Sequence, residues 1–118
     1  MTARNFKKIT YRRIEFSTRA LIDLEELHDY LKGKSPRGYQ NVVGAIEALI
    51  RDIPDNLFRG RETPIDEVWE RLERKYGYVI PYTVRGDVCY ILRVYHAKRL
   101  GLDYTKPFDI KAGLAEKS

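Results

Sequence analysis

The sequence predicts an α+β fold in which a hairpin of two helices packs on one face of a small, curved, mainly antiparallel sheet, in the order β-α-α-β-β-β. Two observations predict this fold. Two amphipathic helical patterns follow one another in the first half of the chain, and three β-rich segments follow in the second half. Because each helix and the sheet have one apolar face, they can bury those faces against each other. A chain of 118 residues is long enough for one such domain.

The first expected strand runs from Ile9 to Phe16, where β-branched and aromatic residues are frequent. Ser17 or Thr18 can cap the helix that follows, which should end near Gly33. Its apolar residues recur at three- and four-residue steps, at Ala20, Leu21, Leu24, Leu27 and Leu31. The acidic residues of this helix, Asp23 among them, are expected on the opposite, polar side.

A second helix should begin at Ser35-Pro36, where a capping hydroxyl precedes proline at the first helical position. Its apolar stripe continues over four turns and stops at Pro54, with members Tyr39, Val42, Val43, Ile46, Leu49, Ile50 and Ile53. Only a few residues separate the two helices, so they should form an antiparallel hairpin.

The second half of the chain predicts a loop at residues 55–66 and strands at residues 68–74, 78–85 and 88–96. Arg85-Gly86-Asp87 is typical of a tight turn between the last two strands. Pro81 lacks a backbone donor and therefore predicts either an edge position or a bulge. The last strand is apolar almost throughout and should be the most buried.

The composition limits the class of protein. Residues 1–100 are expected to form one domain, and residues 101–118 a C-terminal extension. The net charge of +5 and the pI near 9.3 suit an acidic partner or nucleic acid.

The single cysteine, Cys89, lies in an apolar segment and predicts a reduced thiol in a cytoplasmic protein. One cysteine and two distant histidines argue against a metal site, and we expect no cofactor. No apolar stretch approaches a membrane span or a signal peptide, so no membrane partner is expected.

Three segments together resemble the RelE/ParE superfamily of bacterial toxins from type II toxin–antitoxin systems. They are FSTRALIDLEELHDYL, SPRGYQNVVGAIEALIRDIPDNLFRGR and RKYGYVIPYTVRGDVCYILRVYHAKR. Each segment alone is short and largely hydrophobic, so the resemblance rests on their order and spacing over roughly residues 11–99. It implies the fold predicted above and a cognate antitoxin as partner.

The superfamily divides into RelE-like toxins, which cleave mRNA on the ribosome, and ParE-like toxins, which are associated with poisoning DNA gyrase. RNA cleavage needs an acid, a base and a cation for the developing phosphorane charge. RelE-like nucleases commonly carry an arginine three residues before the hairpin tyrosine, and the matching segment YVIPY has Val79 there. Valine can neither donate a hydrogen bond nor carry charge, so the sequence favours the ParE-like branch, which binds gyrase without a catalytic centre.

The alternative is a metal-independent mRNA endonuclease that uses Arg61, Arg93, Tyr95 and His96. A third possibility, a non-toxic interaction module, is compatible with the basic charge.

The candidate surface for target or antitoxin consists of basic and apolar residues. The basic ones are Arg61, Arg71, Arg74, Arg93, His96, Lys98 and Arg99, and the apolar ones near the helix ends are Tyr30, Tyr39 and Phe58. An ordinary structural role also fits several of them: His96 can bond to backbone at a strand end, and a basic stripe can be a solvated face. The resemblance implies an antitoxin segment that folds across such a surface.

Overall fold

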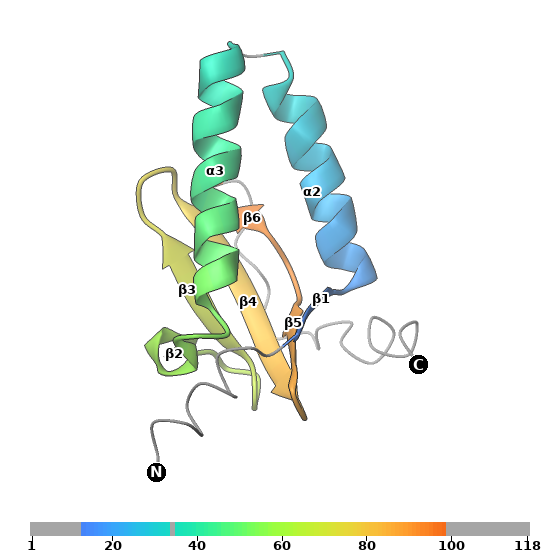
Figure 1. The fold of residues 1–118 in the computed structure, drawn as a ribbon, viewed down its shortest axis with the longest axis vertical. Coiled ribbons are helices and arrows are strands. Elements are labelled where there is room, and N and C mark those ends of the chain that lie inside the picture. Colours follow the sequence, from blue (N-terminus) through green and yellow to red (C-terminus); the bar gives the residue numbers. More distant parts are fainter. Residues whose placement is uncertain (1–12, 34, 99–118) are drawn as a thin grey trace.

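A two-helix hairpin lies across one face of a six-stranded sheet in the computed structural model, which describes residues 13–33 and 35–98 (Figure 1). The strand order is β1-β5-β4-β3-β2, and β6 pairs with β4 beyond the end of β5. The β1–β5 pair is parallel and the other pairs are antiparallel. The predicted α+β class is therefore confirmed. Arg99, the extension at residues 101–118 and the first part of the expected N-terminal strand lie outside the described residues.

Both helices begin at the predicted caps. α2 (Thr18–Leu31) follows Ser17, whose Oγ accepts a hydrogen bond from the Ala20 N–H at 3.0 Å. α3 (Pro36–Asp52) follows Ser35, whose Oγ accepts from the Gly38 N–H at 3.0 Å. The Ser17 hydroxyl also donates to the Leu92 carbonyl at 2.9 Å, so the same side chain that starts α2 fixes it against the sheet.

The strands differ from the prediction in two places. The described strands are β1 (Arg13–Phe16), β2 (Arg61–Glu62), β3 (Trp69–Glu73), β4 (Tyr78–Arg85), β5 (Val88–Ile91) and β6 (Tyr95–His96). The segment expected to be loop at residues 55–66 contains the 3-10 turn η1 (Leu57–Arg59) and the edge strand β2. The expected strand at residues 88–96 is two strands separated by residues 92–94. The turn between β4 and β5 is tight as predicted, with Gly86 at a φ of 60°.

Pro81 lies in the central strand β4 rather than on an edge, and a bulge accommodates it. Tyr82 pairs with Ile91 and Val79 pairs with Tyr95, so two residues of β4 oppose the three residues 92–94. The Pro81 carbonyl accepts from the Leu92 N–H at 2.8 Å. A strand residue directs its N–H and C=O to the same neighbouring strand. The N–H that Pro81 lacks would therefore point towards residues 92–94, where the bulge already interrupts the hydrogen-bond ladder. Of the two predicted solutions, the bulge is confirmed.

The core lies between the hairpin and the sheet. Its largest members include Ile46 and Ile53 of the α3 region and Ile80, Tyr82 and Ile91 of the sheet, all almost fully buried. Their burial supplies most of the driving force for packing the two layers together. Within residues 13–33 and 35–98, no helix is both long and apolar enough to cross a membrane.

Candidate functional site

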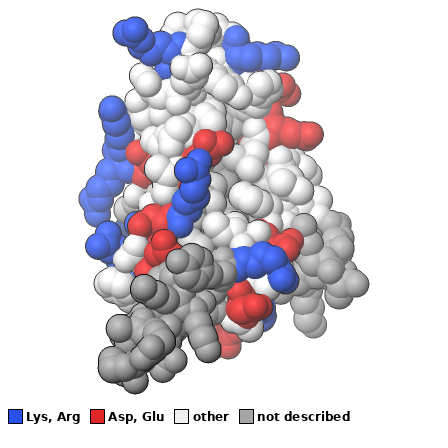
Figure 2. Space-filling view, in the orientation of Figure 1, with Lys and Arg blue, Asp and Glu red and all other residues white. Residues whose placement is uncertain are grey.

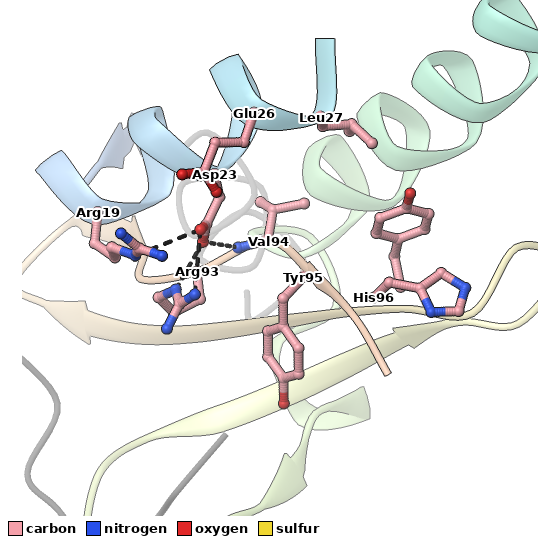
Figure 3. A pocket seen from close by; sticks show the side chains of 9 residues that line it. Arg19, Asp23, Glu26, Leu27, Arg93, Val94, Tyr95 and His96 are labelled. Carbon is pink, nitrogen blue, oxygen red and sulfur yellow. Dashed lines mark hydrogen bonds and ion pairs between the residues drawn. The ribbon is translucent and has the colours of Figure 1, made fainter. Parts of the chain in front are cut away.

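The basic end of the β5–β6 segment forms a small pocket against α2 (Figure 3). Its volume is about 120 Å³. The lining residues are Arg19, Asp23, Glu26, Leu27, Tyr78, Arg93, Val94, Tyr95 and His96. The pocket therefore contains three of the residues that the sequence singled out, Arg93, Tyr95 and His96. We call it the strand-end pocket.

Asp23 is the centre of this pocket. One carboxylate oxygen accepts from Arg93 Nε at 2.7 Å and from the Val94 N–H at 2.9 Å, and the other accepts from Arg93 Nη2 at 3.2 Å (Figure 3). Arg19 Nε lies 3.5 Å from the same carboxylate. The Asp23 side chain is only 4% exposed, so its expected place on the polar side of the helix was wrong. A bidentate pair of this kind holds the Arg93 guanidinium in a structural role.

Tyr95 and His96 point to opposite faces of the sheet because they are neighbours on one strand. His96 pairs with Tyr78 and its ring lies edge-on to the Tyr78 ring at 5.1 Å. His96 Nδ1 accepts the Lys98 N–H at 3.0 Å, which is the backbone contact of an ordinary strand-end histidine. Tyr95 points away from α2 in Figure 3, and the Arg93 guanidinium carbon is 5.8 Å from its ring centroid. The two side chains are therefore not directed at a common point.

Arg61 lies at the far edge of the sheet, on β2. Three strand spacings separate β2 from β6, which amounts to about 14 Å across the sheet. The structure therefore does not bring Arg61 together with Arg93, Tyr95 and His96. Val79, at the position where a nuclease arginine would be expected, lies within β4 and is 4% exposed.

A second cluster of basic residues surrounds Arg61. Arg59, Arg61, Glu70, Arg71, Leu72 and Arg74 line a groove of about 280 Å³, which we call the arginine groove. Figure 2 shows Lys and Arg side chains gathered along the left edge of the molecule, on the side where Figure 1 draws β3. The basic residues predicted as one surface thus belong to two separate places, Arg93 and His96 to the strand-end pocket and Arg61, Arg71 and Arg74 to the arginine groove.

Two arginines of the groove are fixed by carboxylates. Arg61 Nε lies 2.6 Å from Glu70, whose side chain is 7% exposed, and Arg71 Nη2 lies 2.9 Å from Asp52 at the end of α3. Arg71 Nη1 is buried and has no hydrogen-bond partner within the described part of the chain. Arg59 and Arg74 are exposed. The sequence analysis missed Arg59, although its place beside Gly60-Arg61 was a local signal for it.

Gly60 and Tyr82 position the start of the groove. The Tyr82 hydroxyl donates to the Leu57 carbonyl at 2.7 Å, which ties η1 to the central strand. A Cβ at Gly60 would overlap the Tyr82 hydroxyl oxygen and would lie 2.7 Å from Cζ. The turn that presents Arg59 and Arg61 can therefore approach the sheet only with glycine at this position.

We expect the Tyr82 phenol to make stability fall at high pH. Burial, reinforced by the neighbouring Cys89 thiol, raises the pKa of Tyr82 to about 12, against the opposing effects of the Arg71 guanidinium and the Gly60 N–H. Above pH 10 the unfolded chain loses this proton and the folded chain keeps it, so the free energy of unfolding decreases as pH rises towards 12. Denaturant unfolding of the wild type and of Tyr82→Phe between pH 8 and pH 11.5 measures how the free energy of unfolding depends on pH. The decrease should be smaller in Tyr82→Phe, and equal slopes would contradict the assignment.

The apolar candidates have different environments. Phe58 is 81% exposed and Tyr30 is 54% exposed, whereas the half-buried Tyr39 hydroxyl lies 2.6 Å from His28 Nδ1 on α2. Leu21 and Ile22 are also exposed on α2, which the sequence analysis did not anticipate. Lys98 is exposed at the end of the described chain. Among the described residues, no group of three metal-ligating side chains is close enough to hold an ion.

Comparisons with known proteins agree with this architecture. A family model described as the ParE toxin of the type II toxin–antitoxin system parDE matches residues 14–101. A solved structure of a chromosomal ParDE toxin–antitoxin system from P. aeruginosa superposes with a TM-score of 0.64 at 19% sequence identity, covering 74% of this chain and 97% of that chain. A comparison with curated protein sequences gives no match.

Proposed function

Because the chain belongs to the ParE toxin family of type II toxin–antitoxin systems, we propose that it arrests growth by binding DNA gyrase and that a cognate antitoxin neutralises it. Its place of action is the cytoplasm, where both partners are found. The toxin works by binding, without a catalytic step of its own.

One observation carries the choice of binding over RNA cleavage. The four side chains that could form a nuclease centre are divided between two edges of the sheet and two of its faces, because Arg61 lies on β2 and Tyr95 and His96 alternate on β6. General acid–base catalysis needs its groups within hydrogen-bond reach of one reacting phosphate. Arg93 is already bound to Asp23 on two nitrogens, which leaves the pocket without a free guanidinium from this position.

The exposed side of α2 supports the proposed antitoxin contact. Leu21, Leu24, Glu25, His28 and Asp29 line an open groove of about 690 Å³ along this helix. The groove is mainly apolar, two of its lining residues are acidic, and Figure 2 shows broad uncharged areas over the hairpin. An amphipathic helix can bury its apolar face in a groove of this kind. We propose that a helix of the antitoxin does so here.

Inducible expression without antitoxin tests the proposal, with gyrase activity and mRNA integrity measured in parallel. We expect growth arrest, loss of plasmid supercoiling or accumulation of gyrase-dependent DNA breaks, and intact transcripts. The purified chain should likewise inhibit supercoiling by purified gyrase. Co-expression of a small protein encoded next to the toxin gene should restore growth and form a stable complex.

The alternative function gives the opposite result in the same cells. A ribosome-dependent endonuclease would produce new mRNA 5′ ends at codon-defined positions while plasmid supercoiling stays unchanged. That outcome would overturn the gyrase proposal. Normal growth at high expression would contradict both and would leave an interaction module without toxicity.

A further inference from the structure

The arginine groove carries more positive charge than its own carboxylate balances. Four arginines and a single carboxylate line it, and that carboxylate, Glu70, is paired with Arg61. Arg71 is likewise bound to a carboxylate at the end of α3. Within residues 13–33 and 35–98, neither Arg59 nor Arg74 forms an ion pair with a carboxylate, and both side chains are exposed. The groove therefore presents two guanidinium groups to solvent without a counter-charge.

The nearest carboxylates in the sequence are engaged elsewhere. Glu73 is next to Arg74, but its carboxylate accepts the Tyr76 N–H at 2.7 Å and so belongs to the turn after β3. Asp66 and Glu67, in the loop before β3, line a different pocket. Figure 2 shows Lys and Arg side chains along this edge of the molecule. The charge of the two exposed arginines is therefore available to an anionic partner.

The arginines are spread along the groove instead of converging on one point. Arg61 lies opposite Glu70, and Arg74 follows the end of β3, four residues beyond Glu70. Four residues of extended chain span about 13 Å. One strand of DNA carries a phosphate for about every 3.4 Å of helix axis, so this length corresponds to a run of about four phosphates. A guanidinium group can bind two oxygens of one phosphate, which makes arginine well suited to such a backbone.

Phe58 adds an apolar contact beside the groove. It is the most exposed large apolar side chain of the described residues, at 81%, and the Arg59 guanidinium carbon lies 5.9 Å from its ring centroid. The hydrogen bond from the Tyr82 hydroxyl to the Leu57 carbonyl fixes this turn on β4. Proteins that bind the minor groove of DNA commonly combine arginine with an apolar side chain that inserts between base pairs. Base pairs supply a flat apolar partner for the ring, which a run of carboxylates lacks.

We propose that the arginine groove binds the phosphate backbone of duplex DNA, with Arg59 and Arg74 as the main phosphate contacts and Phe58 at the minor groove. Arg71 is fixed 2.9 Å from Asp52 and its side chain is only 12% exposed, so it adds positive potential without direct contact. The inference rests on the proposed function in one respect: the DNA is that on which gyrase acts. The toxin then recognises gyrase with its DNA in preference to gyrase alone.

Binding of the full chain to a labelled DNA duplex of random sequence, measured by fluorescence anisotropy between about 50 and 200 mM salt, tests the site. We expect the logarithm of the affinity to fall linearly with the logarithm of the salt concentration. Arg59→Ala with Arg74→Ala should weaken binding at least about tenfold and reduce this slope by about two, one for each lost phosphate contact. The matched control is Arg37→Ala with Arg51→Ala, two exposed arginines of α3 outside the groove, which should keep the slope. Equal losses in both pairs would reduce the effect to net charge and overturn the site.

Further probes separate the components of the contact. Phe58→Ser removes no charge, so it should weaken duplex binding and leave the salt slope unchanged. Unchanged affinity would remove Phe58 from the contact and overturn the minor-groove assignment. Polyglutamate of equal charge that binds more tightly than the duplex, and loses affinity in Arg59→Ala with Arg74→Ala, would make the groove a protein-docking surface instead. Tighter binding of single-stranded DNA or RNA would overturn the assignment to duplex DNA.

Purified gyrase separates this site from the proposed function. The toxin should bind gyrase more tightly with DNA present than without it, and Arg59→Ala with Arg74→Ala should remove that difference while binding to DNA-free gyrase is kept. If the wild type inhibits gyrase but neither binds the duplex nor gains affinity from DNA, the inference about the groove fails alone. If the chain binds the duplex with the expected dependence on Arg59 and Arg74 but gyrase is unaffected, the proposed function fails and the DNA site remains.

Discussion

Gly60→Ala is expected to destabilise the protein by about 3 kcal/mol, because the new methyl group has no space. Its Cβ would overlap the Tyr82 hydroxyl oxygen and lie 2.7 Å from Tyr82 Cζ and 3.0 Å from Trp69 Cβ. The backbone of Gly60, with φ −72° and ψ 143°, is accessible to any residue, so the whole penalty is steric. Urea unfolding followed by far-UV circular dichroism measures the loss.

Two controls isolate the steric cause. Tyr82→Phe removes the overlapping oxygen, so the double variant Gly60→Ala, Tyr82→Phe should lose less stability than the sum of the single variants. Gly44→Ala places the same methyl group in α3 where no atom lies within 4 Å, and it should stabilise by about 0.5–1 kcal/mol through helix propensity. Strict additivity of Gly60→Ala and Tyr82→Phe would contradict the proposed contact.

Asp23→Asn should cost about 3 kcal/mol, because it removes the charge that compensates a largely buried guanidinium. Arg93 is 21% exposed and Asp23 4% exposed, so solvent can replace only part of the lost interaction, which keeps the expected cost at the lower end for buried pairs. The substitution also weakens the acceptor of the Val94 N–H. Thermal unfolding measures the stability, and amide exchange at Val94 should accelerate beyond the change in global stability.

The exposed Asp29 provides the matched control on the same helix. Asp29 lies 3.7 Å from Lys32 with both side chains mostly in solvent, so Asp29→Asn should change stability by no more than about 0.5 kcal/mol. Arg93→Met alone leaves Asp23 buried and should destabilise, whereas Asp23→Asn combined with Arg93→Met should cost less than the sum of the two. An Asp23→Asn variant as stable as the wild type would show that the pair contributes no net stability.

The helices and the turn between β4 and β5 could be predicted because their determinants are local. Ser17 and Ser35 bond to amides three residues ahead, and Gly86 adopts its positive φ within the turn that contains it. The division of the last strand could not be predicted in the same way. The division depends on the Asp23 carboxylate, which lies 71 positions earlier in the chain and accepts a hydrogen bond from the Val94 N–H. The apolar pattern of the strand does not indicate that contact.

The sequence by itself determined the fold class, the helix boundaries and the family resemblance, since caps, apolar periods and motif spacing all act over a few residues. Only the tertiary structure decided which basic residues belong together. Arg61 and Arg93 look equivalent in the sequence, but one is paired with Glu70 at the sheet edge and the other with Asp23 beneath α2. The physical reason is that a buried or partly buried charge requires an opposite charge nearby. Arg61 finds its partner on the adjacent strand, nine residues away, and Arg93 finds its partner on α2, 70 residues away, so the pairing is decided by how strands and helices pack.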